Sequence, residues 1–344
     1  MKPNSENSIG ILDQRYILIK NLGSGVSSEV YKAKDSHSNK IYAVKVFNKY
    51  TESIQKEIEY NKIISQNINE QFPNYIKYIT SSIGPLELKN DSQESGTPET
   101  KAYIIFEFGS KGALFDYIKC TKEILDERFV KVIFIKLVKA LRYLHVLGFC
   151  HRDLKIENIV LSGEEFIIKI LDFGFSSKIT RNKDGKAELQ TEYVGTKECA
   201  APEVLDCTPY DGEKADIFSL GVILFNLRTG FRGFKNAKCY NLNQTKGKFY
   251  QVKDKSELLY SLIRYKNYIM YWNLLGLFIN VDELSEQFKD LYLKMVAYNP
   301  NERPTLGEIF NDDYFDDIRE LNEDQLKALE QEIISELKRR EALI

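Results

Sequence analysis

Two short polar motifs, a fixed distance apart, constrain this sequence more than any other feature. The first is the segment His151–Asn158, which contains Asp153. The second is an Asp-Phe-Gly triplet that begins at Asp172, fourteen residues after Asn158. Phosphoryl transfer requires a carboxylate that orients the attacking hydroxyl, and an amide and a second carboxylate that hold Mg²⁺ across the phosphates. Asp153, Asn158 and Asp172 provide that set in that order.

In order and spacing these motifs resemble the signatures of the eukaryotic protein kinases, H-R-D-L-x-x-x-N and D-F-G. The resemblance covers residues 12–314. It implies an α+β, two-lobed protein-kinase fold with MgATP bound in the cleft. We expect a small lobe with an antiparallel β-sheet and one helix, a larger, mainly helical lobe, and a charged helical tail. The expected bounds are 12–108 for the small lobe, 107–112 for the hinge, 113–314 for the large lobe and 315–344 for the tail.

The length, net charge and apolar content of the chain are those expected of a soluble protein with two hydrophobic cores. The chain has 344 residues, and single cores stop growing near ~250–300 residues. Its net charge of −2 gives no argument for a nucleic-acid or membrane partner. The longest apolar stretch, Tyr268–Ile279, is shorter than the ~20 residues of a membrane helix. We expect it to form a buried or partner-docking helix of the larger lobe.

The cysteines bear on the compartment. The chain has five, scattered and without a C-x-x-C pair. This pattern favours reduced thiols in a cytoplasmic or nuclear protein over a disulfide framework or a zinc site.

Local patterns predict the elements that carry these motifs. Short β-branched and aromatic runs in residues 11–47 predict strands, and apolar spacing predicts a helix at about 51–65. Residues 75–107 have strand character, and residues 127–147 have the spacing of a strongly amphipathic helix. Two polar insertions are expected to be exposed loops, at 90–98 and 236–255.

A glycine-rich segment precedes the second predicted strand. Gly23, Ser24 and Gly25 begin a run that resembles the kinase loop G-x-G-x-x-G-x-V, with Ser28 in place of the third glycine. The missing Cβ atoms let backbone N–H groups approach phosphates. A dinucleotide-binding fold is the alternative, but it needs a helix after the glycines, whereas Val30 begins a strand pattern.

Lys45 matches the strand lysine of the kinase V-A-I-K motif, which neutralises the α- and β-phosphates. A lone lysine on a strand is more often a solvated edge residue, but Lys45 lies between two valines. It needs a glutamate on the next helix, because an unpaired ammonium would swing away from the phosphates. Glu57 is our choice and Glu59 the alternative. Asn61 stands four residues after Glu57, where the family usually has an apolar residue.

The resemblance also implies an adenine site. Phe106–Gly109 resembles the hinge, with Phe106 limiting the depth of the pocket. Adenine would bond backbone groups of Glu107 and Gly109. Apolar side chains would enclose it from both sides: Leu22, Val30, Ala43 and Val160.

Further roles follow from the resemblance. Asp153 would accept the hydroxyl proton of the substrate. Lys155 would contact the γ-phosphate and, with Thr196, indicates the Ser/Thr branch. The remaining matches are structural: Phe173 and Gly174 in the metal-binding turn, Glu203 paired with Arg303, and Asp216 bracing the catalytic-loop backbone.

Regulation centres on Arg152, a cation that in many relatives pairs with a phosphothreonine of the activation loop. Glu192 occupies that position here. We therefore hypothesise that Glu192 pairs with Arg152 without modification, so that the enzyme is active as synthesised. The adjacent Thr191 and Tyr193 keep phosphorylation as the competing hypothesis.

Substrate preference is indicated by few residues. Phe175, after the metal-binding turn, resembles relatives that prefer Ser over Thr. Glu157 matches an acidic position that some relatives use to recognise basic residues upstream of the acceptor. Ala113 and Asn226 stand at other such positions and weaken that interpretation.

After residue 314 the sequence becomes charged and helical, with Asn322 and Gln325 as an N-cap pair. Three hypotheses remain open for this tail: a helix packed on the large lobe, a coiled-coil or partner-binding helix, and an autoinhibitory segment. The apolar stripe consists of Leu326, Leu329, Ile333 and Leu337.

The sequence thus predicts an ATP-dependent serine/threonine protein kinase that acts on proteins. The segment Ser219–Leu224 most resembles the calcium/calmodulin-dependent kinase-like group, although no clear calmodulin-binding segment follows. A pseudokinase scaffold is the alternative, but Lys45, Asp153 and Asp172 are all retained. A small-molecule kinase of related fold is disfavoured by Lys155 and the Ala-Pro-Glu segment that ends at Glu203.

Overall fold

The structure is a computed structural model, and the chain in it divides into two compact units. The first comprises residues 1–111 and 161–174, and the second comprises residues 112–160 and 175–344. The expected loop at 90–98 and most of the one at 236–255 lie outside the residues that the structure describes. Those residues are 8–25, 27–69, 73–88, 99–239 and 258–344.

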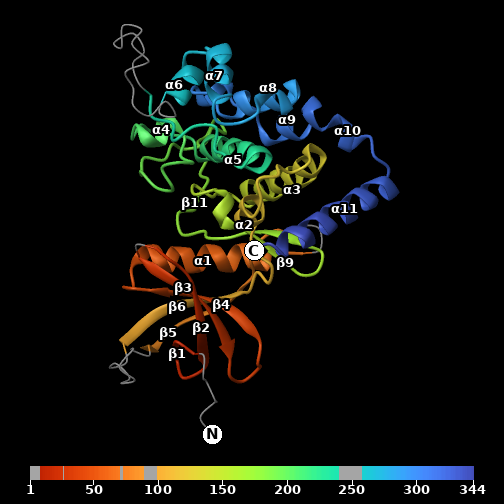
Figure 1. The fold of residues 1–344 in the computed structure, drawn as a ribbon. Helices are drawn as coiled ribbons and strands as arrows, with labels where there is room; N and C mark the ends of the chain where they lie inside the picture. Colours follow the sequence, from red (N-terminus) through yellow and green to blue (C-terminus); the bar gives the residue numbers. More distant parts are fainter. Residues whose placement is uncertain (1–7, 26, 70–72, 89–98, 240–257) are drawn as a thin grey trace. The chain divides into compact units, whose positions relative to one another are not determined.

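The first unit is built on antiparallel strands in the order β1-β2-β3-β4-β6-β5, with β1 also paired to β5. Helix α1 lies beside the strands (Figure 1) and contacts β5. The bounds are β1 Gly10–Leu12, β2 Tyr16–Ser24, β3 Ser28–Asp35, β4 Ile41–Phe47, α1 Glu52–Gln66, β5 Tyr78–Leu88, β6 Glu99–Glu107 and β10 Ile167–Ile170. Strand β9, Ile159–Ser162, has its first two residues in the second unit and its last two in the first.

Alternation along the strands explains this sheet. Side chains alternate between buried and partly exposed positions over residues 31–35 of β3 and 43–46 of β4, as expected for strands with one face on a core. The predicted strands within 11–47 and the helix at about 51–65 therefore agree with the structure. The core consists of Leu12, Tyr16, Leu18, Tyr31, Ala33, Val44, Val46, Leu86, Tyr103 and Ile105.

Residues 161–174 group with the first unit although they follow the catalytic loop in sequence. Asn74 explains much of this, because its Nδ2 donates to the carbonyl of Ile168 at 3.0 Å and its own carbonyl accepts from the Ile170 N–H at 2.8 Å. Lys169 adds an ion pair to Glu107 at 2.6 Å. A single break near 107–112 therefore does not describe how the chain divides.

The second unit is mainly helical, as predicted. Its longest helix, α3, matches the expected amphipathic helix at 127–147. The bounds are β7 Gly112–Ala113, α2 Leu114–Lys119, α3 Glu127–Val146, β8 Phe149–Cys150, β11 Ser177–Lys178, α4 Pro202–Leu205, α5 Gly212–Thr229, α6 Leu259–Arg264, α7 Tyr268–Leu275, α8 Glu286–Met295, α9 Leu306–Phe310, α10 Asp316–Arg319 and α11 Glu323–Glu341.

Helix α5 is the buried centre of this unit. All its residues from Ala215 to Thr229 are buried, and most of them are apolar, as expected for a helix at the centre of a core. It packs against α3 and α8. Asp211 caps its N-terminus by accepting from two backbone N–H groups, and Gly230 ends it in the left-handed conformation at φ 74°.

The apolar stretch Tyr268–Ile279 forms α7 over its first eight residues. Within the helix only Tyr271 and Leu275 are buried, whereas Ile269 is 79% exposed. Burial therefore applies only to the inner face of α7, because so short a helix contacts the core through few positions. The alternative of a partner-docking helix stays a prediction. No helix among the described residues has the length and apolar character needed to cross a membrane.

The tail forms helix α11, which contacts α2 and α3 and runs beside them in Figure 1. A reciprocal pair of hydrogen bonds between Asn322 and Gln325 caps its start. Leu329, Ile333 and Leu337 are buried, so the apolar stripe faces the unit.

Arg340 fastens the end of this helix. Its side chain is 1% exposed and donates to the carbonyl oxygens of Tyr117 at 3.0 Å and Glu123 at 2.9 Å. Tyr117 lies in the last turn of α2, where carbonyls lack partners within the helix. On α11 itself, the guanidinium groups of Arg339 and Arg340 lower the pKa of Glu336 to about 2, so this carboxylate stays charged at neutral pH.

We expect Arg340→Ala to destabilise the second unit by about 2–3 kcal/mol, because it removes charged donors from buried carbonyls. The measurement is the free energy of unfolding in urea. Arg339→Ala is the matched control, since that side chain is 48% exposed, and we expect a much smaller change. Equal effects of the two substitutions would contradict the anchoring role of Arg340.

Candidate active site

The glycine-rich segment forms the turn between β2 and β3. Gly23 pairs with Val30, and the N–H of Gly25 donates to the carbonyl of Ser28 at 2.8 Å. A Cβ at Gly23 would meet nothing within 4 Å, and one at Gly25 would meet only the Ser28 carbonyl at 3.5 Å. Internal packing therefore does not require these glycines. The turn is exposed, with Leu22 43% exposed, and it leaves room for a group that approaches its backbone.

Lys45 projects from β4 between two carboxylates. Its Nζ lies 2.7 Å from Oε1 of Glu57 and 2.8 Å from Oδ1 of Asp172. Glu57 is buried on α1, whereas Glu59 is exposed. Burial by itself lowers the pKa of Lys45, but the carboxylates of Asp172 and Glu57 outweigh it and raise the pKa above its usual value. Lys45 is therefore a fixed cation at neutral pH.

One turn after Glu57, Asn61 is buried and donates from Nδ2 to the backbone carbonyl of Glu57 at 2.8 Å. Its Oδ1 is also buried and has no hydrogen-bond partner among the described residues. This polar side chain is held by its own helix, which explains how α1 accommodates it at a buried position.

The Asp-Phe-Gly turn depends on a close approach. A Cβ at Gly174 would lie 3.0 Å from Oε2 of Glu57 and 3.2 Å from Oδ1 of Asp172. Phe173 is 1% exposed and its ring centroid lies 6.1 Å from that of Tyr75. Asp172 itself has φ 62°, an unfavourable conformation for a non-glycine residue. Packing around the turn thus fixes Asp172 in the position from which it reaches Lys45.

The predicted adenine-binding residues are partly exposed at the end of β6 and nearby. Phe106 is 8% exposed, and the Glu107 N–H donates to the carbonyl of Lys77 at 2.9 Å. Gly109, Val30 and Ala43 are partly buried in the same unit, whereas the partly buried Val160 belongs to the second unit.

In the second unit, Asp153 lies at the centre of a polar network. Its Oδ1 accepts from the Thr196 N–H at 2.7 Å, and its Oδ2 lies 3.0 Å from Nζ of Lys155. Lys155 also donates to Oγ1 of Thr196 at 2.6 Å. Nδ2 of Asn158 donates to the Asp153 carbonyl at 2.9 Å. The catalytic loop and the segment that contains Thr196 are therefore linked through one carboxylate.

A buried carboxylate on α5 braces this loop. Asp216 is 1% exposed, and its two oxygens accept from the backbone N–H groups of His151 and Arg152, each at 2.8 Å. Nε2 of His145 lies 2.9 Å from the same carboxylate. Our sequence analysis missed His145. Its signal was a polar side chain at the end of an apolar helix, six residues before His151.

Arg152 lies among neutral acceptors and one carboxylate. Its Nε donates to the Phe175 carbonyl at 2.7 Å, and its Nη1 donates to Oε2 of Glu192 at 3.0 Å. The Arg152 side chain is 6% exposed and that of Glu192 is 67% exposed. Thr191 and Tyr193 are exposed on either side.

Glu203 and Arg303 form a bidentate ion pair at 2.6 and 2.7 Å. Arg303 is 2% exposed and also donates to the backbone carbonyls of Ala297 and Lys214. A buried guanidinium requires a carboxylate partner and further hydrogen-bond acceptors, and Arg303 has both.

The donor set for a metal consists of oxygens. Among the residues that the structure describes, no three or more His, Cys, Asp or Glu side chains gather as a metal site. Asn158, whose Nδ2 is engaged, offers Oδ1, and Asp172 offers a carboxylate. Such hard oxygen donors, few in number, fit Mg²⁺, which is usually bound by one or two protein groups together with phosphate oxygens.

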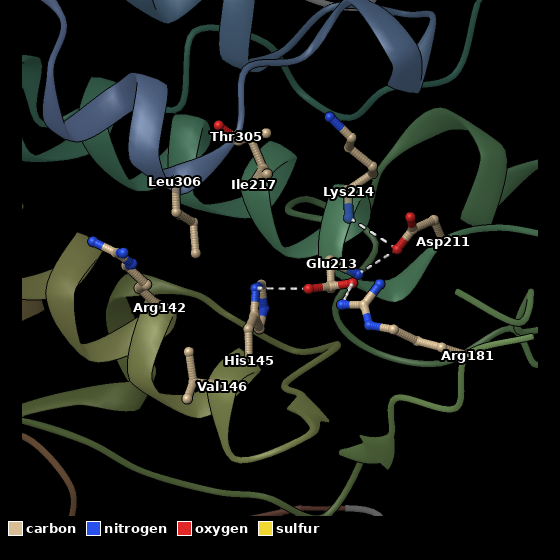
Figure 2. A pocket seen from close by; sticks show the side chains of 10 residues that line it. All are labelled: Arg142, His145, Val146, Arg181, Asp211, Glu213, Lys214, Ile217, Thr305 and Leu306. Carbon is tan, nitrogen blue, oxygen red and sulfur yellow. Dashed lines mark hydrogen bonds and ion pairs between the residues drawn. The ribbon is translucent and has the colours of Figure 1, made fainter. Parts of the chain in front are cut away.

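A cavity of about 570 Å³ lies elsewhere on the second unit, among α3, α5 and α9. Figure 2 shows Arg181 and His145 pointing toward Glu213, at 2.7 and 3.9 Å between the nearest polar atoms. None of the residues predicted to bind nucleotide or perform catalysis lines this cavity. It touches the site only through His145 and its contact with Asp216.

Gly195 lets the chain around it come close to the catalytic loop, residues 151–158. It has φ 88°, and a Cβ there would collide with the Arg152 carbonyl and lie 3.4 Å from Oδ1 of Asp153. Gly185 also has positive φ, at 76°, but its Cβ would meet nothing within 4 Å. Alanine at Gly185 would therefore cost only the free energy of a left-handed backbone, whereas alanine at Gly195 would add the cost of a steric collision.

We expect Gly185→Ala to cost about 1 kcal/mol of unfolding free energy, from the left-handed backbone alone. Gly195→Ala adds the collision with backbone and is expected to cost about 2–4 kcal/mol in total. Urea unfolding of both variants measures the difference. If Gly195→Ala cost no more than Gly185→Ala, the close contact with Arg152 would be refuted.

Comparison with known proteins agrees with this geometry. A family model described as protein kinase domain matches residues 16–315, close to the expected 12–314. The chain is 31% identical to the SNF-related serine/threonine-protein kinase of Homo sapiens over 302 residues, covering 86% of this chain and 33% of that protein. It is 30% identical to CBL-interacting serine/threonine-protein kinase 26 of Arabidopsis thaliana over 321 residues, covering 91% and 61%.

Testis-specific serine/threonine-protein kinase 1 of Mus musculus is 34% identical over 215 residues, covering 62% of this chain and 55% of that protein. This chain thus spans less than two thirds of the length of each of these relatives. The family model nevertheless matches most of the chain, and the predicted α+β architecture and family are confirmed. The chain belongs to the protein kinase family.

Proposed function

We propose that this protein is an ATP-dependent serine/threonine protein kinase that transfers the γ-phosphate of MgATP to Ser or Thr hydroxyls of other proteins, with Ser preferred. The observation that carries the proposal is the position of Lys45 between Glu57 and Asp172. A lysine that served only to solvate a strand edge would not lie 12% exposed between two carboxylates. The names of the similar proteins, which are serine/threonine-protein kinases, favour the same activity.

Each group then has a chemical task. MgATP, when bound, supplies the phosphoryl group that is transferred, and its Mg²⁺ neutralises part of the negative charge of the phosphates. Lys45 would bind α- and β-phosphate oxygens, and the exposed glycine turn would offer N–H groups to the phosphates. Asn158 and Asp172 would hold the metal. The hinge segment at Glu107 and Gly109 bonds adenine, with Leu22, Ser24, Val30, Ala43 and Val160 around the nucleotide.

Asp153 orients the acceptor hydroxyl and accepts its proton late in the transfer. Lys155 stands beside this carboxylate and contacts the γ-phosphate. Thr196 fixes both, through its N–H to Asp153 and its hydroxyl to Lys155. An acceptor hydroxyl entering beside Thr196 thus meets a carboxylate whose direction is already set, which lowers the entropy cost of the reaction.

The direct test incubates the protein with MgATP and a mixture of Ser, Thr and Tyr peptides. We expect transfer to Ser and Thr, and a loss of at least about a thousandfold in Lys45→Met and Asp172→Ala, because several kcal/mol of barrier depend on these groups. Lys40→Met, an exposed lysine of the same unit, is the control and keeps its activity. If the wild-type protein transfers no phosphate, the pseudokinase scaffold is favoured. If it phosphorylates small molecules but no peptide, a small-molecule kinase of related fold is favoured.

For regulation, we propose that the enzyme is active as synthesised. The support is the bond between Arg152 and unmodified Glu192. Because Glu192 is largely exposed, the pair alone contributes modestly, and Arg152 also relies on the Phe175 carbonyl. Thr191 and Tyr193 remain the candidates for the competing hypothesis.

We expect Glu192→Ala to lower kcat about two- to fivefold, since an ion pair of this kind is worth up to ~1 kcal/mol. Phosphatase treatment of the wild type is expected to change nothing. Glu198→Ala, a nearby carboxylate of the same segment, is the control. Loss of activity after phosphatase treatment, with Glu192→Ala unaffected, would establish phosphorylation of Thr191 or Tyr193 instead.

Two further assignments belong to this proposal. The five cysteines are free, which supports a reducing compartment, the cytoplasm or the nucleus. The tail helix is a resident part of the large unit; the support is its buried stripe and Arg340. Its exposed side remains available to a protein partner.

A further inference from the structure

Glu157 lies in the catalytic loop but takes no part in the network around Asp153. Its Oε1 accepts a hydrogen bond from Nη2 of Arg232 at 2.7 Å. Both side chains are about one third exposed, at 31% and 34%. Oε2 of Glu157 is buried and has no hydrogen-bond partner in the part of the chain that the structure describes. A cation that approaches from outside therefore meets a carboxylate that is already paired with Arg232.

The backbone at Arg232 is held by its neighbours. The Phe231 N–H donates to Oγ1 of Thr229 at 3.1 Å, and the Gly233 carbonyl accepts from Oη of Tyr271 at 3.1 Å. A Cβ at Gly233 would collide with the buried tyrosine hydroxyls beneath it. The turn after α5 thus places the guanidinium, so little ordering entropy is lost when it pairs with Glu157.

This ion pair is close to the reacting groups. Glu157 lies in the short helical turn Ile156–Asn158 of the second unit. In the same turn, Nδ2 of Asn158 donates to the carbonyl of Asp153 at 2.9 Å. An extended peptide advances about 3.3 Å per residue, so a peptide whose hydroxyl reaches Asp153 carries its neighbouring side chains past the pair.

Building on the proposed function, we propose that Arg232 is a specificity-determining residue that closes Glu157 to basic substrates, so that the enzyme takes acceptor peptides with an acidic or neutral residue beside this pair. A substrate Arg or Lys has to compete with a guanidinium that is tethered at high effective concentration. A substrate carboxylate instead meets a cation with five N–H donors, of which the bonds among described residues use one.

The selectivity follows from repulsion as well as attraction. With Arg232 present, an incoming cation meets a like charge, which disfavours it. With Arg232 removed, Glu157 becomes an uncompensated carboxylate next to the catalytic loop and would attract a basic side chain. The expectation from family resemblance, that Glu157 recognises basic residues, is thus reversed by one residue seventy-five positions later in the chain.

The test compares peptides that differ only in Arg, Ala or Glu at each position flanking a Ser acceptor. We expect the wild type to rank Glu and Ala above Arg at the position that faces the pair. In Arg232→Ala, kcat/KM for the Arg peptide relative to the Ala peptide is expected to rise about two- to fivefold, as for a partly exposed ion pair. The double variant Glu157→Gln with Arg232→Ala is expected to lose this gain.

Two comparisons guard against a merely structural effect. Arg232→Gln removes the charge while keeping an amide, and is expected to give the same change in preference if Arg232→Ala folds poorly. Lys266→Ala removes a cation from an exposed ion pair with Glu302 and is expected to leave the ranking unchanged. A wild type that prefers Arg, or an Arg232→Ala gain that persists in the double variant, would overturn the inference.

Peptide affinity, measured by fluorescence anisotropy with a non-hydrolysable ATP analogue and Mg²⁺, repeats the comparison without turnover. A protein that binds the peptides but transfers nothing refutes the proposed function, and the affinity ratios still decide the role of Arg232. A protein that transfers phosphate without any difference between wild type and Arg232→Ala refutes the present inference alone.

Discussion

A buried ammonium is costly unless carboxylates surround it, and Lys45 is positioned by meeting that requirement from two sides. One carboxylate comes from α1 and the other from the turn at Asp172. A strand, a helix and a distant turn must therefore all be in place before Lys45 is fixed. The absence of a Cβ at Gly174 is part of the same condition, because that turn packs against Glu57.

In the second unit the buried charged group is an anion, and hydrogen-bond donors surround it. There the buried group is the carboxylate of Asp216, and the donors are backbone N–H groups of the catalytic loop. Because α5 is buried along most of its length, it is a rigid support for that carboxylate. Arg152 adopts φ 63° where the loop turns over it, so hydrogen bonds compensate a strained backbone at the residue before Asp153.

Residues with local or motif-based signals could be found from the sequence. Glu57 could be preferred over Glu59 as the partner of Lys45, because a helix that turns Glu57 toward Lys45 also turns the neighbouring isoleucines toward the core. The partition of residues 161–174 was not predictable, since it depends on Asn74, an ordinary polar residue of a loop. The pair of Glu157 and Arg232 left no local pattern either, because turn packing brings together residues that are far apart in sequence. His145 acts through the side chain of Asp216 and Gly195 through its close approach to the Arg152 backbone, and composition and periodicity record neither contact.

The anchor at Arg340 bears on how the chain folds during synthesis. Its partner Tyr117 precedes it by 223 residues. At ~5–20 residues per second, a ribosome needs about 10–45 s to make that interval. Throughout this time the carbonyls of Tyr117 and Glu123 lack their hydrogen bonds from Arg340, and the surface beneath α11 is uncovered. The large unit is therefore completed late, and a chaperone that shields this surface would act in that interval.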